Sequence, residues 1–234
     1  MLLLVPSPLS QKTPSLPLLQ ADLPLVRGIS TWVVENAKPA RAALALLGME
    51  KPIRQLTLLE LATLDKTERV RLLNQASPEA PIGLMSDAGC PAVADPGAEL
   101  VQLAHDLNCP VHPLVGPSSI VMTLMGSGLN GQRFTFHGYP PVDASARDAW
   151  IATTEKTSKS QACTQLAIET PFRNERLIEA LLKVLSPTTR LCVAWDLTGA
   201  EARIVTKQVA DWRRQAPSPG KFPCMFAWLA KAEP

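Results

Sequence analysis

Short apolar runs, several with β-branched residues, alternate with helix-length amphipathic segments along the first half of this chain. The apolar runs occupy residues 2–5, 31–35, 82–85 and 111–115, and the helix-length segments occupy residues 39–47, 66–76 and 97–107. Strands separated by helices lie parallel in one sheet, because each helix crosses over a face of that sheet. The first half is therefore predicted to be an α/β unit around a largely parallel sheet.

A second series of runs follows residues 115–129, where we expect the joint between two domains. Its predicted strands are residues 133–137, 163–168, 191–195 and 221–229, and its predicted helices are residues 147–156, 171–185 and 207–214. The polar stretches 153–160 (TTEKTSKS) and 216–221 (APSPGK) are expected to be loops. A chain of 234 residues suffices for two small cores. We predict domains at residues 1–116 and 117–234.

Charge and cysteine usage narrow the class of protein. Lys and Arg number 23 against 21 Asp and Glu, so no global basic field points to nucleic acid and any RNA contact must be local. Residues 141–234 hold 13 of those cations and 10 of the acids. Five cysteines with no CxxC pair and no histidine at metal spacing predict no zinc site and no disulfide framework. We expect a cytoplasmic protein with no metal and no membrane-spanning segment.

The loop SDAGCPAVADPG, residues 86–97, directly follows the run 82–85. Ligands of α/β proteins bind outside the carboxyl ends of the strands, so this loop is a candidate site. Gly89 would let a ligand approach the backbone closely. Asp87 is a candidate contact, whereas Asp95, just before Pro96, is interpreted as a helix N-cap.

A second loop, GPSS at residues 116–119, follows the run 111–115 and begins another apolar helix. It would direct the Ser118 and Ser119 hydroxyls to the same edge of the sheet. No Lys or Arg lies between Arg71 and Arg133, and GxxxxGK[ST] does not occur. The site is thus predicted to disfavour nucleotide di- and triphosphates, while a sulfonium with an amino-acid end is compatible with it.

Four segments carry a family resemblance: SDAGCPAVADPG, LVGPSS, FTFHGYPP and AIETPFRNE, in this order. They resemble the tetrapyrrole methylase superfamily of S-adenosylmethionine (SAM) methyltransferases, and most nearly the branch that 2′-O-methylates a ribose of 16S ribosomal RNA. The resemblance implies two α/β domains of the class III methyltransferase type, with SAM in the cleft between them, and a homodimer.

The resemblance also implies which residues contact the cofactor. In the first domain these are Pro8 and Leu9 after the first strand, Cys90, Pro91 and Val93 in the first loop, and Ser118 and Ser119 in the second. In the second domain, Ile168 and Ala194 would flank the adenine.

Three residues are candidates for catalysis, since a ribose hydroxyl is a poor nucleophile and gains from a base or an alkoxide-stabilising group. Glu35 resembles the acidic position of the family's Glu-Asp-Thr-Arg segment, which reads Glu35-Asn36-Ala37-Lys38 here. Glu169 and Arg173 resemble the family's Glu and Arg pair. Their spacing of four equally fits a structural salt bridge.

The sequence therefore predicts a SAM-dependent methyltransferase acting on a ribose 2′-hydroxyl of ribosomal RNA, with the small ribosomal subunit as partner. One alternative keeps the chemistry and takes a tetrapyrrole or another small molecule as acceptor. Another, motivated by the altered segment after Glu35, is a SAM-binding module without catalysis.

Overall fold

The computed structural model describes residues 1–10, 12 and 14–231. The chain divides into two compact units, Met1–Ser118 and Ser119–Pro234. Each unit has its own sheet and its own hydrophobic core. Within the described residues, no helix has both the length and the apolar character needed to cross a bilayer.

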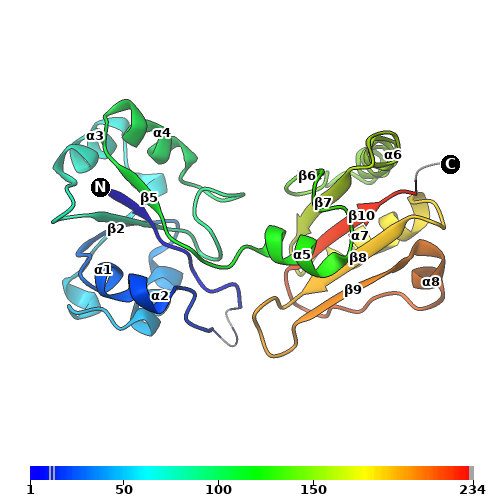
Figure 1. Cartoon of the computed structure of the whole chain (residues 1–234), viewed down its shortest axis with the longest axis horizontal. Helices are drawn as coiled ribbons and strands as arrows, with labels where there is room; N and C mark the ends of the chain where they lie inside the picture. The colour runs from blue at the N-terminus through cyan, green and yellow to red at the C-terminus, as the bar shows by residue number, and fades with distance from the viewer. Residues whose placement is uncertain (11, 13, 232–234) are drawn as a thin grey trace. The chain divides into compact units, whose positions relative to one another are not determined.

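The first unit is built on five parallel strands in the order β3-β2-β4-β1-β5. Figure 1 shows α1 and α2 on one side of this sheet and α3 and α4 on the other. The strands are β1 (Leu2–Leu4), β2 (Thr31–Val34), β3 (Thr57–Glu60), β4 (Ile82–Met85) and β5 (Val111–Pro113). Its helices are α1 (Leu23–Arg27), α2 (Ala37–Leu47), α3 (Lys66–Gln75) and α4 (Ala98–Asp106), with short 3-10 turns at Gln20–Asp22, Ile53–Gln55 and Leu61–Thr63. The predicted parallel α/β unit is confirmed; β3 and α1 were not predicted.

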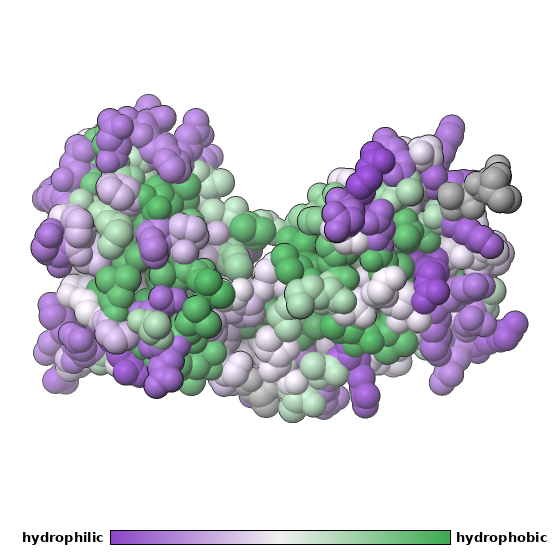
Figure 2. Space-filling view, in the orientation of Figure 1, coloured by the Kyte–Doolittle hydropathy of each residue, from purple (hydrophilic) through white to green (hydrophobic). Residues whose placement is uncertain are grey.

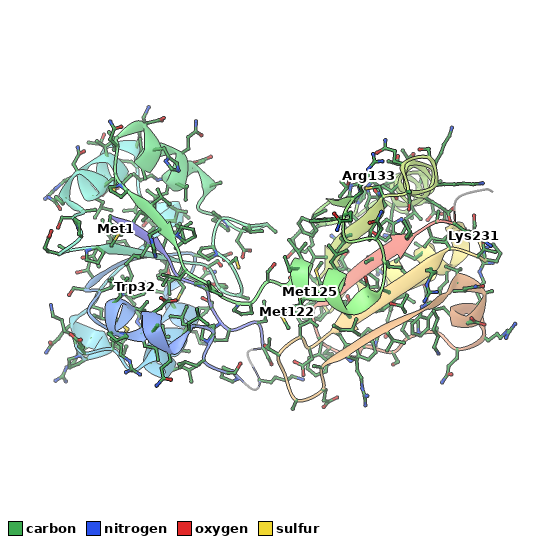
Figure 3. The ribbon with its side chains drawn as sticks, in the orientation of Figure 1. Met1, Trp32, Met122, Met125, Arg133 and Lys231 are labelled. Carbon is green, nitrogen blue, oxygen red and sulfur yellow. The ribbon has the colours of Figure 1, made fainter. Side chains whose placement is uncertain are left out.

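Successive side chains of β2 point to opposite faces of the sheet, so the hydrophobic core of the first unit has a part on each face. Trp32 and Val34 pack with Leu44 of α2, whereas Val33 packs with Leu100 of α4 on the other face. Trp32 is labelled in Figure 3. Its ring lies against Gly83 of β4, where a Cβ atom would overlap the ring. Polar side chains gather over α3 and α4 at the surface (Figure 2). Both faces of the sheet are thus covered, which leaves the strand ends for a site.

The second unit has a mixed sheet in the order β6-β7-β10-β8-β9, in which only β6 and β7 pair in parallel. The strands are β6 (Phe134–Phe136), β7 (Thr164–Glu169), β8 (Arg190–Trp195), β9 (Arg203–Gln208) and β10 (Cys224–Leu229). Its helices are α5 (Ser119–Ser127), α6 (Ala144–Gln161), α7 (Asn174–Val184) and α8 (Val209–Arg214).

Helices cover both faces of this second sheet. Phe226 of β10 lies in a core with Ile151 of α6 and Leu177 of α7. On the opposite face, α5 contacts β9, because Thr206 donates a hydrogen bond of 2.8 Å to the Ser127 carbonyl. The unit is a three-layer α/β/α arrangement, consistent with the predicted class.

The second unit differs from the predictions at two places. The predicted helix 207–214 begins only at Val209, because residues 203–208 form β9 and pair with β8. The predicted loop 153–160 lies inside α6. The helix tolerates this polar stretch because Asp143 caps its first turn. The Thr154 hydroxyl also donates a hydrogen bond of 3.0 Å to the Ile151 carbonyl.

Candidate functional site

The loops that follow β1 and β4 are joined by backbone hydrogen bonds at the carboxyl edge of the first sheet. Ser7 donates to the Gly89 carbonyl at 2.8 Å, and Gly89 donates to the Ser7 carbonyl at 3.1 Å. The buried Ser7 hydroxyl donates to the Ser86 carbonyl at 2.6 Å. These bonds bring Pro8 and Leu9 beside the 86–97 loop.

The loop after β5 also lies against Gly89 and Cys90 of the 86–97 loop. Gly89 has φ +73°, and a Cβ there would lie 3.1 Å from Leu9 Cδ2 and 3.6 Å from the Pro117 carbonyl oxygen. Cys90 donates from its thiol to the same carbonyl at 3.4 Å. Three segments distant in sequence thus meet around Gly89, and a side chain larger than hydrogen would fill the space between them.

The Cys90 thiol is held in its protonated form. Burial raises its pKa, and the negative charge of Asp95 raises it further. A thiol with a raised pKa is a poor nucleophile, so Cys90 serves as a small packing residue of the loop.

The loop backbone is strained on either side of Val93. Ala92 and Ala94 have φ +67° and +63°, values that side chains rarely adopt. Each such residue costs about 1 kcal/mol. The surrounding contacts therefore impose the shape of the loop, and such strain often accompanies a ligand site.

Carboxylates gather where β2 and β4 end. The Asp87 amide donates to Glu35 Oε2 at 3.1 Å, and Asn36 Nδ2 donates to Asp87 Oδ2 at 2.8 Å. Burial raises the pKa of Asp95 to about 6, with Glu35 and Asp87 adding repulsion and a hydrogen bond with Ser86 opposing it. The predicted N-cap role of Asp95 is wrong, because Gly97 takes the N-cap position of α4 and no side chain caps that helix.

A pocket of about 390 Å³ opens beside these carboxylates. Its lining residues are Glu35, Leu61, Ala62, Arg69, Asp95, Pro96, Gly97, Ala98 and Glu99. Arg69 is already engaged by Glu99 at 3.2 Å and by two backbone carbonyls. The pocket consequently offers acceptors and negative charge, which suit a neutral or cationic group better than a phosphate. No cluster of possible metal ligands occurs among the described residues.

The remaining predicted cofactor contacts are distributed as follows. In the first unit Pro91 is buried, Asp87 and Ser118 are half-buried and Val93 is exposed. In the second unit Ser119 opens α5, and Ile168 and Ala194 both stand opposite Met225 of β10. Residues directly opposite one another point to the same face, so Ile168, Met225 and Ala194 form one row on the sheet.

Glu169 and Arg173 form a closed ion pair within the second unit. Glu169 is 2% exposed, and its Oε2 accepts from Arg173 Nε at 2.9 Å and Nη2 at 2.6 Å. Its Oε1 accepts from the Thr170 amide at 2.7 Å. Arg173 Nη2 also donates to the Pro140 carbonyl at 2.9 Å. The salt-bridge interpretation describes these contacts, and the catalytic assignment of both residues stays a prediction.

Sequence reasoning missed three residues of these two edges: Asn36, Asp95 and Met225. Asn36 directly follows Glu35, so its place beside the acidic position was a usable signal. Asp95 was misassigned because an Asp before Pro is typical of an N-cap. Met225 carried no signal, since its neighbours come from two other strands.

Sequence and structure comparisons place these observations among known proteins. No family model matches the chain. It is 35% identical over 123 residues to ribosomal RNA small subunit methyltransferase I of Xylella fastidiosa, which covers 53% of this chain and 44% of the relative. The protein of that name from Mycobacterium tuberculosis is 31% identical over 144 residues, with 60% and 49% covered. The chain spans about half the length of these curated relatives.

Solved structures show the fold. Uroporphyrin-III-C-methyltransferase from Thermus thermophilus matches 97% of this chain and 93% of its own, with a TM-score of 0.53 and 16% identity. The cobalamin biosynthetic enzyme cobalt precorrin-4 methyltransferase matches with a TM-score of 0.56 and 14% identity, covering 97% and 93%. The chain has the tetrapyrrole methylase fold. The resemblance indicated by its motifs is confirmed.

Proposed function

We propose that this chain is a SAM-dependent methyltransferase that methylates a ribose 2′-hydroxyl of ribosomal RNA. The observation that carries the proposal is the meeting of three loops around Gly89, where backbone groups and small side chains, rather than cations, line the edge of the sheet. This arrangement suits a ligand recognised by backbone contacts. The relatives of similar sequence are methyltransferases of ribosomal RNA by name.

The residues fit SAM in their chemistry. Its sulfonium is cationic, and Glu35, Asp87 and Asp95 supply negative charge at the same edge. Pro8, Leu9, Gly89, Cys90, Pro91, Val93 and Ser118 would hold it in the first unit, and Ser119, Ile168 and Ala194 are the proposed contacts of the second. When bound, SAM supplies an electrophilic methyl group.

In the reaction, the residues of this chain would bind and orient SAM and the acceptor, and would remove a proton from the acceptor hydroxyl. A methyl transfer needs the acceptor oxygen in line with the departing sulfur, so positioning supplies much of the rate. Glu35 is the proposed base, since it lines the pocket and the Asp87 amide orients its carboxylate. Glu169 and Arg173 are proposed to hold the loop after β7 in place, because their charged groups already bind each other.

A tetrapyrrole acceptor is the second candidate, favoured by the solved neighbours, which by name act on uroporphyrin or precorrin. Porphyrinoid acceptors are anionic and need unpaired cations around them. The pocket beside Glu35 offers carboxylates instead, and its Arg69 is already paired. We therefore favour the ribose. We also propose that the chain forms a homodimer and acts on the small ribosomal subunit. We propose the cytoplasm as its location, because its five cysteines form no disulfide.

Calorimetry of SAM and S-adenosylhomocysteine with the purified chain tests the cofactor assignment. Gly89→Val and Ser118→Trp should abolish binding, whereas Gly131→Val, at a glycine with no atom within 4 Å of its would-be Cβ, should leave it unchanged. Transfer of labelled methyl to small ribosomal subunits, with free RNA nucleosides and uroporphyrinogen as rival acceptors, then tests the substrate. An absence of SAM binding would refute the proposal.

A further inference from the structure

Two exposed aromatic side chains occur where β6 and β7 end. Phe172 is 90% exposed and Tyr139 is 54% exposed. The strands are parallel neighbours, and the Ile168 amide donates to the Gly138 carbonyl at 3.0 Å. Both aromatics therefore lie at one edge of the second sheet. They are the only aromatics among the large exposed apolar side chains of the described chain, apart from Phe134.

The backbone that presents Phe172 is fixed on both sides. Arg173 is bonded to Glu169 and also to the Pro140 carbonyl in the loop that follows Tyr139. Asn174 is buried, and its Nδ2 donates to the Phe222 carbonyl at 2.7 Å. These bonds tie together the loops after β6 and β7 and the loop before β10. The loop is thus anchored while its largest apolar side chain faces solvent, at a cost that a partner would offset.

Positive charge surrounds this edge. Arg176 and Lys221 are exposed, and Arg173 keeps 31% of its side chain exposed while paired with Glu169. Asp143, in the loop after Tyr139, and Glu175 are exposed acids of the same loops. The whole second unit has 14 Lys and Arg against 10 Asp and Glu, a net charge of +4, whereas the first unit has 9 against 11. The charge balance favours an anionic partner over an apolar one.

We propose that Tyr139 and Phe172 form a stacking platform for unpaired bases of single-stranded RNA, with Arg176 and Lys221 contacting its phosphates. This inference deepens the proposed function and rests on it for the choice of RNA. Aromatic faces stack on any base that is not already stacked in a helix, and cations beside them follow the backbone. A-form duplexes hide their base faces, so the platform selects loops, bulges or single strands.

The test is fluorescence anisotropy of the full chain with a labelled single-stranded RNA 12-mer of mixed sequence and with its duplex. Stacking predicts a loss of about ten-fold or more in affinity for the single strand in Phe172→Leu, which keeps the apolar volume and removes the ring. Phe172→Tyr should retain the affinity. Phe134→Leu is the matched control at the start of β6 and should leave the affinity unchanged.

Two further readouts separate stacking from a structural effect. An RNA carrying 2-aminopurine should lose fluorescence on binding to the wild-type chain and lose less on binding to Phe172→Leu. Arg176→Glu should weaken binding in a salt-dependent way and leave the 2-aminopurine response of the bound complex intact. Thermal unfolding of each variant shows that it is folded.

Several outcomes would overturn the platform: no measurable binding of the single strand, equal binding of single strand and duplex, or unchanged affinity in Phe172→Leu. If the aromatic edge binds a protein instead of RNA, the single strand should show no measurable binding. SAM calorimetry on the same samples keeps the two proposals apart. RNA affinity that depends on Phe172, without SAM binding, would refute the methyltransferase and leave the platform. SAM binding without RNA affinity would refute the platform and leave the methyltransferase.

Discussion

The Asp87 amide donates a hydrogen bond of 3.1 Å to Glu35 Oε2, and this bond joins the carboxyl ends of the neighbouring strands β4 and β2. It turns Glu35 from an isolated acid at a strand end into part of a cluster with Asp87 and Asp95. The orientation of the proposed base thus depends on a backbone donor, which substitution of the Asp87 side chain would not remove.

Stability should depend on pH through Asp95. Its pKa is raised from 3.8 to about 6 in the folded state, so between these values the native chain binds more protons than the unfolded chain. Stability contributed by the neutral carboxyl is therefore lost as pH rises through that window. Asp95→Asn should stabilise the fold at pH 7 by about 1 kcal/mol, after allowing for solvent screening at a half-buried group.

Urea unfolding from pH 4 to pH 8 measures this effect of Asp95. Asp106→Asn, on the exposed end of α4, is the control and should leave the pH dependence as it is in the wild type. A parallel shift of the Asp95→Asn and wild-type curves at every pH would contradict the assignment.

Gly83 is predicted to be intolerant of any side chain. A Cβ there would overlap the Trp32 ring, and both residues lie inside paired strands that cannot move apart. Gly83→Ala should destabilise the fold by about 1–3 kcal/mol through overpacking. Denaturant unfolding monitored by tryptophan fluorescence gives the value, and Gly131→Ala, in open space, is the comparison. Equal stabilities of the two variants would count against the packing argument.

Ala94→Gly is predicted to stabilise the chain. The residue has φ +63°, which costs an alanine about 1 kcal/mol and a glycine little. The same substitution at Ala42, exposed in the middle of α2, should destabilise by about 1 kcal/mol because helix propensity falls. Thermal unfolding should therefore show opposite signs for the two variants. A lower melting temperature for Ala94→Gly would refute the claim of strain.

Removal of Arg173 should cost more stability than removal of a surface cation. Arg173→Met leaves Glu169 buried without its ion pair, which is expected to destabilise by about 3 kcal/mol. Lys183→Met breaks the exposed pair with Asp148 and should cost less than about 1 kcal/mol. Chemical denaturation distinguishes the two. Recovery of stability in the double variant Glu169→Gln with Arg173→Met would confirm that the unpaired carboxylate causes the loss.

The sequence alone predicted four of the five strands of the first unit and the loops that follow three of them. Runs such as residues 82–85 are apolar throughout, which only a strand covered on both faces requires, and the loop with Gly89 directly follows that run. The carboxyl ends of parallel strands share one edge, so the meeting of the loops with Pro8, Gly89 and Ser118 follows from order along the chain.

Tertiary structure decided what depends on partners distant in sequence. Residues 203–208 form a strand because β8 supplies their hydrogen bonds, although the local pattern predicted a helix from residue 207. Asp95 left the N-cap role for a cluster with Ser86 and Glu35, since Gly97 provides the turn into α4. The aromatic edge of Tyr139 and Phe172 likewise exists because β6 and β7 pair in parallel. Local sequence specifies backbone preferences, whereas packing determines which side chains meet.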